Sequence, residues 1–289
     1  MKLKNVKYYL QIIKPGIVLG NLIPFSACFL FASKGNINYN LFLVTFIGMF
    51  LIISGSCVLN NIIDIKIDNI MLRTKNRVLV RNKISVIKAL FFAFFLLFLG
   101  FLIILFFSNF FSLLLSFFGF FVYIFLYSMI FKRTTVFSIF IGSISGAMPP
   151  IIGYYIVSNK VDLAFFIFFF MFFLWQVPHF FSISIFRAKD YKNAKVPILP
   201  STKSIFFTSI VILFFVILFT CVSESLYLYN FLDKKYCIFS ILINFIWVCS
   251  IVFGCFYNKN IFFYYVFIIS ILSNCITSFF IAIDYINFK

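Results

Sequence analysis

Long apolar runs separated by short polar segments repeat along this chain of 289 residues. A helix that crosses the hydrocarbon core of a bilayer needs about 20 mostly apolar residues, and nine segments qualify. They are residues 16–33, 41–60, 84–107, 110–131, 136–157, 162–182, 204–223, 236–256 and 261–285. Only Ser108 and Asn109 separate the third segment from the fourth. The pattern predicts an all-α, polytopic membrane bundle of about nine helices, with residues 1–289 forming a single integral-membrane domain.

The composition supports the same class of protein. Hydrophobic residues make up 64% of the chain and charged residues only 11%, whereas an average soluble domain is about a quarter charged. A soluble fold of this size could not bury 50 phenylalanines and 15 tyrosines without exposing large apolar patches. The seven cysteines occur singly, mostly in apolar runs, and the chain has one histidine. We therefore expect no zinc site, and the cysteines to act as small packing residues.

The net charge of +17 has to be interpreted by position, because Lys and Arg gather in the cytoplasmic loops of membrane proteins. With the amino terminus inside, 19 of the 24 basic residues fall in cytoplasmic segments, and the outer ones are Lys34, Lys160, Lys234, Lys235 and Lys289. This asymmetry predicts a cytoplasmic amino terminus and an outer carboxyl terminus. It also makes the lipid bilayer, and not nucleic acid, the expected partner. The first apolar run is long enough to span, so no cleavable signal peptide is expected.

Acidic residues are rare, and their positions are informative. Asp162, Glu224, Asp233 and Asp284 are expected in outer loops or near the carboxyl-terminal end, as solvated charges. The remaining three, Asp64, Asp68 and Asp190, fall in two long cytoplasmic loops at about 61–83 and 187–203. These loops occupy equivalent places four helices apart, which suggests two related halves that share one site.

In the first loop, Asn60, Asp64 and Asp68 are four residues apart, so a continuing helix places them on one face. Two like charges at that spacing repel each other, and Mg²⁺ is the natural ion to lie between them. Arg73 and Arg77 repeat the spacing, with Lys75 between them. Guanidinium groups bind phosphate oxygens in pairs. The pattern indicates a site in which carboxylates, aided by the Asn60 amide oxygen, hold a metal while basic groups hold a diphosphate.

The second loop can complete this site. Asp190 can supply an oxygen to the same metal from the opposite half, and Arg187 and Lys195 can contact phosphate. His179 is the only histidine and lies inside a predicted span, directly after Pro178. It is either a hydrogen-bonded packing residue or a ligand, because intramembrane ionisable groups commonly mark functional sites.

The motif Asn60-x₃-Asp64-x₃-Asp68, with the following Arg73-Thr74 and Arg77, resembles the first aspartate motif of the UbiA-type intramembrane prenyltransferases. Several segments are similar to the haem-modifying branch of that family, the protohaem IX farnesyltransferases (haem O synthases). They are Trp175-Gln-x-Pro-His179, Ile-Phe-Arg187, Asp190-Tyr191, the Val-Pro-Ile-Leu-Pro200 ending, Lys14-Pro15-Gly16 and Ser143 to Pro150. The resemblance covers residues 10–200 by motif and the last three helices only by hydropathy.

Two positions depart from the family pattern. Many UbiA relatives carry a second aspartate four residues after the first one of the second motif, and here Ala194 follows Asp190 at that distance. This leaves the coordination of a second metal open. Val78 follows Arg77 where much of the family has proline, and we expect only a local change of the loop.

The resemblance implies a UbiA-prenyltransferase-like fold and Mg²⁺-dependent transfer of a farnesyl group from farnesyl diphosphate to a vinyl group of haem B. Water is added, and haem O and diphosphate are the products. Haem is then a substrate and not a cofactor, with His179 able to orient it. The implied metal ligands are Asp64, Asp68 and Asp190, and Arg73 and Arg77 neutralise the leaving group. The expected location is the inner membrane of a bacterium. Whether a haem A synthase or a terminal-oxidase assembly is a partner stays open.

Two other functions are compatible with part of this pattern. A UbiA-type enzyme that prenylates an aromatic quinone precursor would share the first motif, but the Trp-Gln-x-Pro-His sequence and the lone Asp190 argue against it. A secondary transporter would place its ionisable site near the bilayer midplane. Here the acidic cluster lies at the predicted cytoplasmic edge, beside arginines, which argues against transport.

Overall fold

A computed structural model of the chain describes residues 2–257 and 260–284, and in this part it contains helices and no strands. The helices are α1 (Lys2–Ile12), α2 (Pro15–Ser33), α3 (Tyr39–Ile63), α4 (Ile65–Ile70), α5 (Val86–Phe107), α6 (Phe110–Phe121), a π-helical segment (Val122–Phe131), α7 (Lys132–Thr134), α8 (Ser138–Gly146), α9 (Met148–Ser158), α10 (Leu163–Phe186), α11 (Ala188–Asn193), α12 (Leu199–Thr202), α13 (Ile205–Leu228), α14 (Lys234–Tyr257) and α15 (Asn260–Ile283).

Nine helical stretches of the described chain are long and apolar enough to cross a membrane, which confirms the predicted number. Residues Phe110–Thr134 form one such stretch although it includes the π-helical segment, and α8 with α9 form another. The short boundary after α5 is also confirmed. Asn109 caps α6, because its side-chain oxygen accepts a hydrogen bond from the amide of Ser112 at 2.8 Å. All seven cysteines are free.

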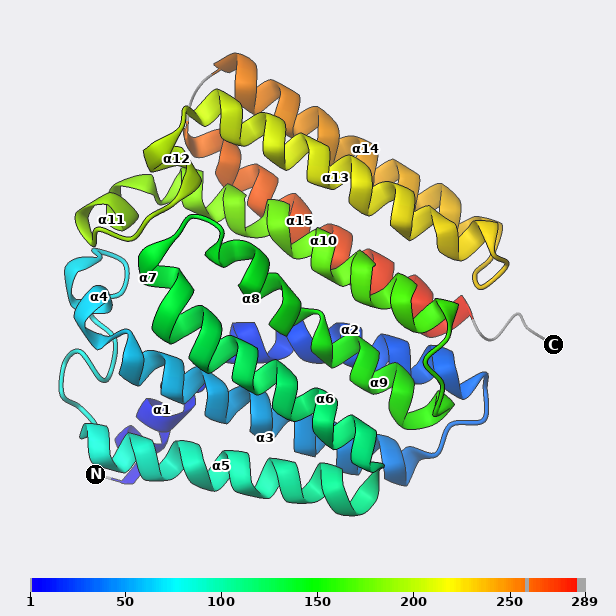
Figure 1. Cartoon of the computed structure of the whole chain (residues 1–289), viewed down its shortest axis with the longest axis horizontal. Coiled ribbons are helices and arrows are strands. Elements are labelled where there is room, and N and C mark those ends of the chain that lie inside the picture. The colour runs from blue at the N-terminus through cyan, green and yellow to red at the C-terminus, as the bar shows by residue number, and fades with distance from the viewer. Residues whose placement is uncertain (1, 258–259, 285–289) are drawn as a thin grey trace.

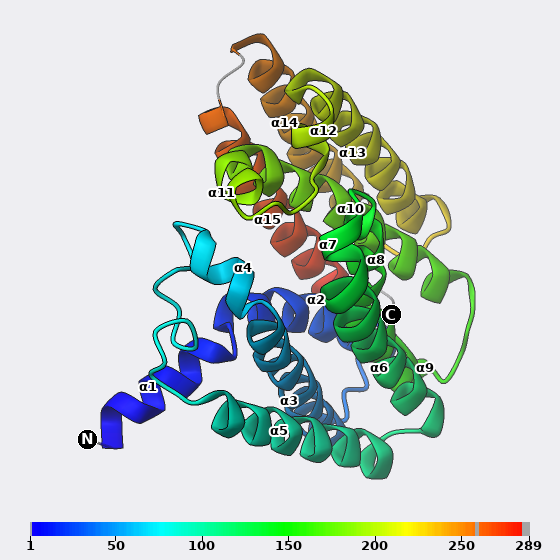
Figure 2. The same ribbon diagram turned by 60° about the vertical axis from the view of Figure 1, so that its left-hand side comes forward.

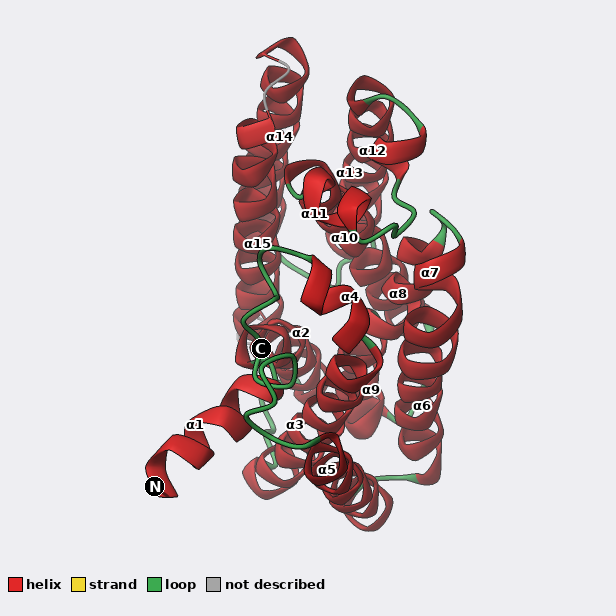
Figure 3. Cartoon of the chain, turned by 90° about the vertical axis from the view of Figure 1, so that its left-hand side faces the viewer, coloured by secondary structure: helices red, strands yellow, loops and turns green. Residues whose placement is uncertain are grey.

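The long helices run side by side, with α4, α11 and α12 gathered at one end of the bundle (Figure 1). Helix α1 lies at the same end and projects away from the bundle, as the turned view shows (Figure 2). Seen onto this end, α4 and α11 lie next to each other over the long helices (Figure 3). The side of the membrane that this end faces stays a prediction from the basic residues. Two of those residues, Lys259 and Lys289, and the last predicted residue of the ninth span, Tyr285, lie outside the described residues.

The fifth spanning stretch is broken at Ala147, between α8 and α9, just before Pro149 and Pro150. Gly146 precedes the break, and the side chain of Gln176 from α10 lies directly on it. A Cβ atom built at Gly146 would be only 1.8 Å from Nε2 of Gln176. The missing side chain therefore makes room for a buried polar group of a neighbouring helix.

Two predicted positions are wrong. Asp284 was expected as a solvated charge, but its side chain is buried and its Oδ2 accepts a hydrogen bond from the Asp233 amide at 2.6 Å. Glu224 was expected in an outer loop, but α13 continues to Leu228 and carries Glu224 in its last two turns. Both carboxylate oxygens of Glu224 are buried. The sequence placed the helix end at residue 223 because a charge follows it, whereas neighbouring helices in the bundle shield this charge.

Helices α3 and α5 pack closely because each presents small residues to the other. Gly100 of α5 lies so close to α3 that an added Cβ would be 2.9 Å from the backbone oxygen of Gly48 and 3.0 Å from the amide nitrogen of Ile52. The opposite face of α5 is apolar and exposed, for example at Phe91 and Phe98. Such a helix turns its small residues inward and its phenylalanines towards lipid.

We expect Gly100→Ala to destabilise the bundle by about 1–3 kcal/mol, because the new methyl group has no space against the α3 backbone. Gly20→Ala is the matched control, since a Cβ at Gly20 of α2 would meet nothing within 4 Å. Both changes gain about 1 kcal/mol of helix propensity, so their difference isolates the packing term. Thermal unfolding of the two detergent-solubilised variants measures it. Equal unfolding temperatures would contradict the close approach.

Candidate functional site

The candidate site begins where α3 ends, at the end of the bundle that carries α4 and α11. Asp64 interrupts the helix (φ −87°, ψ 0°), and α4 starts at the next residue. The backbone hydrogen bonds nevertheless continue across the interruption, from the Asp64 amide to the Asn60 oxygen at 2.9 Å and from the Asp68 amide to the Asp64 oxygen at 2.8 Å. The spacing of four predicted from the sequence therefore persists through a bend in the backbone.

Asp64 is buried, and its two carboxylate oxygens have different surroundings. Oδ2 forms an ion pair with the ammonium group of Lys132, which begins α7. Oδ1 is buried and accepts no hydrogen bond within the described residues. A buried carboxylate oxygen without a partner costs free energy. This atom is therefore the clearest candidate in the site for a ligand that binds from outside the chain.

Asp68 is also buried, and it is paired with a residue of its own motif. Nη1 of Arg77 lies 2.6 Å from Oδ2 of Asp68, and the same nitrogen donates to Oδ1 of Asn61 at 3.3 Å. The hydroxyl of Thr74 donates to the Asp68 backbone oxygen at 3.0 Å. These bonds fold the segment after α4 back onto the end of α3, so that basic and acidic halves of the motif lie together.

Asn60 has a role in the structure that its spacing does not reveal. Its amide oxygen accepts a hydrogen bond from Nζ of Lys14 at 2.6 Å. Its amide nitrogen donates to Oγ of Ser128 at 2.9 Å, and Ser128 donates to the backbone oxygen of Tyr123. Asn60 thus joins the start of α2 to the π-helical segment. The amide oxygen that would bind a metal is therefore occupied by the Lys14 ammonium. Ligation of a metal by Asn60 stays a prediction.

Lys14 is partly buried in this arrangement, immediately before α2. Burial lowers the pKa of Lys14 to about 8, because the charged ammonium loses its hydration. Among the neighbouring groups, Cys57 and Asp64 raise this pKa, whereas the charges of Arg77 and Lys132 lower it. An anionic ligand close to Lys14 would stabilise the charged ammonium and so offset the loss of hydration.

The structure brings the second loop onto the first. Oδ1 of Asp190, in α11, accepts a hydrogen bond from the backbone amide of Leu72 at 3.1 Å, across 118 residues of sequence. A small buried apolar cluster, separate from the main core, joins the two loops; it consists of Ile67, Met71 and Val196. Asp190 therefore lies beside the motif of the first loop, and an apolar contact holds it there.

A cavity of about 270 Å³ opens between the end of α1, the start of α2 and the first loop. Its lining residues are Gln11, Ile12, Lys14, Asn61, Asp68, Arg73, Asn76, Arg77, Val78, Leu79 and Val80. Three of these are basic and one is acidic, so the cavity favours an anion. Two predicted phosphate-binding residues, Lys75 and Lys195, are exposed and do not line it. Arg187 does not line it either, and its guanidinium group lies 4.2 Å from the centre of the Phe186 ring.

The carboxylates fit a divalent cation that a substrate helps to hold. Within the described chain, no three His, Cys, Asp or Glu side chains come together as a preformed metal site. Mg²⁺ usually takes one or two carboxylates and completes its shell with water and substrate phosphates. The unpartnered Oδ1 of Asp64 matches such a shared site, next to an anion-binding cavity.

His179 lies apart from these charged groups, where α10 packs against α15. Its Nδ1 is 2.7 Å from Oγ of Ser270, and its ring stacks on Trp175 with centroids 4.9 Å apart. The indole nitrogen of Trp175 donates to the Ser270 backbone oxygen at 2.7 Å. Both of the interpretations that the sequence left open, packing and ligation, are compatible with this position.

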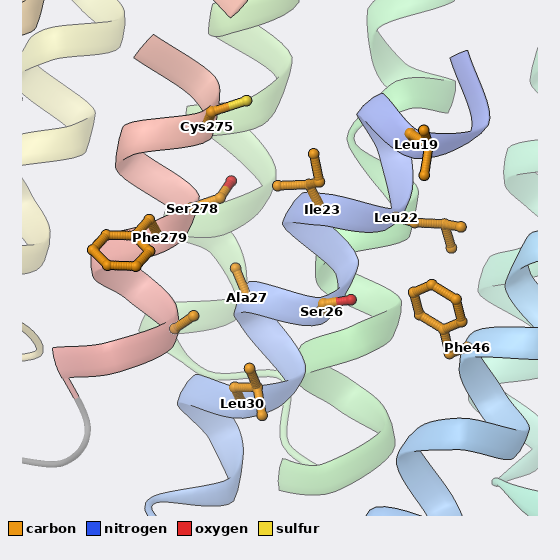
Figure 4. A pocket seen from close by; sticks show the side chains of 11 residues that line it. Leu19, Leu22, Ile23, Ser26, Ala27, Leu30, Phe46, Cys275, Ser278 and Phe279 are labelled. Carbon is orange, nitrogen blue, oxygen red and sulfur yellow. The ribbon is translucent and has the colours of Figure 1, made fainter. Parts of the chain in front are cut away.

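A second cavity, of about 360 Å³, lies between α2 and α15 and is almost wholly apolar. Figure 4 shows Ile23 of α2 directed towards Cys275 and Ser278 of α15, whereas Leu19 and Leu22 lie on the side of Phe46. No charged side chain is among its lining residues, which distinguishes it from the basic cavity at the first loop.

The sequence missed two residues that the structure places in the site, Lys14 and Lys132. Both were counted only as topology signals, because each lies far along the chain from the acidic motif. Their partners are 46 and 68 residues away, at Asn60 and Asp64. The Lys14-Pro15 pair was the only local signal, since it belongs to the segments that resemble the family.

Comparisons with known proteins point to one family. The family model described as the UbiA prenyltransferase family matches residues 21–260. Protoheme IX farnesyltransferase of Protochlamydia amoebophila is 42% identical over 243 residues, covering 84% of this chain and 86% of the relative. The enzyme of the same name from Cronobacter sakazakii is 41% identical, covering 84% of this chain and 82% of the relative.

Solved structures show the same fold. A structure described as digeranylgeranylglyceryl phosphate synthase in membranes superposes with a TM-score of 0.81 at 20% identity, covering 98% of this chain and 99% of that one. A UbiA homologue from Archaeoglobus fulgidus bound to GPP and Mg²⁺ gives 0.69 at 17% identity, covering 95% and 99%. From the family match over most of its length and the identity to these relatives, the chain belongs to the UbiA prenyltransferase family.

Proposed function

We propose that this multi-pass membrane enzyme transfers the farnesyl group of farnesyl diphosphate to a vinyl group of haem B and releases diphosphate, giving haem O. The observation that carries the proposal is the contact between the two loops, which brings Asp190 beside the motif that contains Asp64, Asp68 and Arg77. The names of the relatives, protoheme IX farnesyltransferase, support the choice of acceptor.

The basic residues of the cavity hold the diphosphate in this proposal. Arg73 and Arg77 bind phosphate oxygens, and Lys14 adds a third positive group from α2. The bond between the first farnesyl carbon and the diphosphate oxygen breaks, and its electron pair leaves with the diphosphate. Fixed cations stabilise the charge that grows on the leaving group, which is commonly the largest single contribution to such catalysis.

Asp64, Asp68 and Asp190 are the residues proposed to hold the divalent cation, which when bound polarises the diphosphate as a Lewis acid. Oδ1 of Asp64 is available for this without breaking a contact. Lys132 keeps the same carboxylate in place through its other oxygen. Asn60 positions Lys14 and is proposed as a neutral ligand only if that contact is exchanged.

On the haem side, the allylic cation left by ionisation is attacked by the vinyl group, which forms the new carbon–carbon bond. Water then adds to the cation on the haem side chain and loses a proton. The apolar bundle keeps water from the allylic cation before this step. His179 and Arg187 are proposed to orient the haem, and the exposed Lys75 and Lys195 to attract the anionic substrates at the membrane surface.

We also propose the boundaries and location that go with this activity. Residues 1–289 form one prenyltransferase domain, whose active-site loops are 61–83 and 187–203. The domain lies in the inner membrane of a bacterium, with these loops and the amino terminus in the cytoplasm. Transfer of the product to a haem A synthase or a terminal-oxidase assembly is consistent with its chemistry.

The direct test is mass analysis of haem extracted after the purified protein has been incubated with haem B, farnesyl diphosphate and Mg²⁺. We expect a haem heavier by one farnesyl group plus water, and none when Mg²⁺ is chelated. Incubation with aromatic quinone precursors is the parallel arm. A prenylated quinone precursor in that arm, with unmodified haem, would replace the proposed acceptor.

A further inference from the structure

Helix α15 holds the only histidine of the sequence in a fixed orientation. His179 projects from α10 against α15, where the rings of Trp175 and Phe267 lie with their centroids each 4.9 Å from the imidazole centroid. Ser270 of α15 contacts Nδ1 of the same ring at 2.7 Å. Two aromatic rings and one hydroxyl thus fix both the plane and the rotation of the imidazole.

The hydrogen bonds at Ser270 decide which ring nitrogen of His179 carries the proton. The Ser270 hydroxyl lies 2.6 Å from the backbone oxygen of Phe267, and a carbonyl oxygen can only accept. A hydroxyl has a single proton, so both short contacts of Ser270 are satisfied only if its proton goes to Phe267. Nδ1 of His179 must then donate to the hydroxyl oxygen. In the neutral ring this leaves Nε2 without a proton and with its lone pair free.

Nε2 has no protein partner to use that lone pair. Among the described residues it makes no hydrogen bond, and it is not one of the fully enclosed unpartnered atoms. The rest of the imidazole is held in place, and Nε2 remains accessible. A neutral imidazole whose Nδ1–H is fixed by a hydrogen bond is the form that binds a metal ion through Nε2.

We propose that His179 binds the iron of the haem substrate through Nε2, and that Ser270 is the positioning residue that sets the ring for this contact. This inference rests on the proposed function, since it takes haem to be the acceptor. Helix α15, through Ser270, thereby positions the residue that contacts the haem. Haem lies on the far side of the ring from Ser270, because Nδ1 and Nε2 point in different directions.

The test is a titration of the purified, detergent-solubilised full chain with ferric haem, without farnesyl diphosphate, followed by the absorption and spin-state spectra of the iron. We expect wild-type protein to give a histidine-ligated spectrum and His179→Gly to lose it. Added imidazole should restore the spectrum of His179→Gly, which a packing role for His179 does not predict. The rescue also shows that the variant is folded.

Ser270→Ala tests the positioning role while keeping the ligand. We expect the dissociation constant for haem to rise by about 10–100-fold, the usual effect of removing an outer-shell partner, with a weakened iron–histidine signature. Ser270→Thr retains a hydroxyl and should recover both. The bond from Trp175 goes to the Ser270 backbone oxygen, so it survives either substitution.

Ser273→Ala is the matched control, because Ser273 is equally buried on α15 but donates to Asn244 and not to the histidine. It should bind haem as the wild type does. Identical iron spectra for wild type, His179→Gly and Ser270→Ala would overturn the inference. If such proteins still farnesylate haem, the proposed function stands without the ligand. If wild-type protein neither binds haem nor forms the product, the proposed function falls as well.

Discussion

Asp64→Asn is expected to reduce the Mg²⁺-dependent release of diphosphate by about 100-fold or more. The change removes the negative charge at the buried oxygen that has no hydrogen-bond partner among the described residues, which is the atom proposed to bind the metal. Loss of outer-shell partners alone commonly lowers metal affinity or activity by about 10–100-fold, so loss of a ligand should exceed that. Turnover measured over a range of Mg²⁺ concentrations tests this expectation.

The same variant also leaves the ammonium of Lys132 without its ion-pair partner, and the two effects have to be separated. Breaking a buried pair on one side costs on the order of 3 kcal/mol. We therefore expect Asp64→Asn to unfold at a lower temperature, and the double variant Asp64→Asn/Lys132→Gln to regain stability but not turnover. Near-normal turnover in the single variant would remove Asp64 from the metal site.

Arg77→Gln should lower kcat by about 10²–10³-fold, the effect of removing one group that stabilises charge in the transition state. Arg77 lines the cavity proposed to bind the diphosphate and also forms an ion pair with Asp68 at 2.6 Å. Arg77→Lys keeps the charge but loses the paired donors, so it should recover only part of the rate. Single-turnover release of diphosphate measures this step directly.

Arg81→Gln is the control for Arg77. Arg81 lies four residues further on, is exposed, and binds the side chain of Asn76 instead of an acidic residue. We expect its turnover to match that of the wild type. Equal losses in the Arg77 and Arg81 variants would indicate a general effect of loop charge and not a specific contact with the leaving group.

The sequence was informative wherever the signal is local. Apolar runs of spanning length predicted the nine helices, because a helix in lipid must itself be apolar over about 20 residues whatever its neighbours are. Ser108 and Asn109 predicted the break after α5 because they interrupt the apolar run, and Asn109 caps the helix that follows. Glu224 shows the limit of such reasoning, because a helix that packs against others continues past a charge that its neighbours shield.

By itself the sequence thus determined the fold class, the helix boundaries within a few residues, and the acidic and basic residues of each motif. Only the tertiary structure decided which charges meet. Lys132 with Asp64, Lys14 with Asn60 and Asp190 with Leu72 are joined across 68, 46 and 118 residues. The bend at Asp64 and the contact of His179 with Ser270 were decided in the same way. Hydropathy and spacing describe one segment at a time, whereas these contacts depend on how separate helices pack.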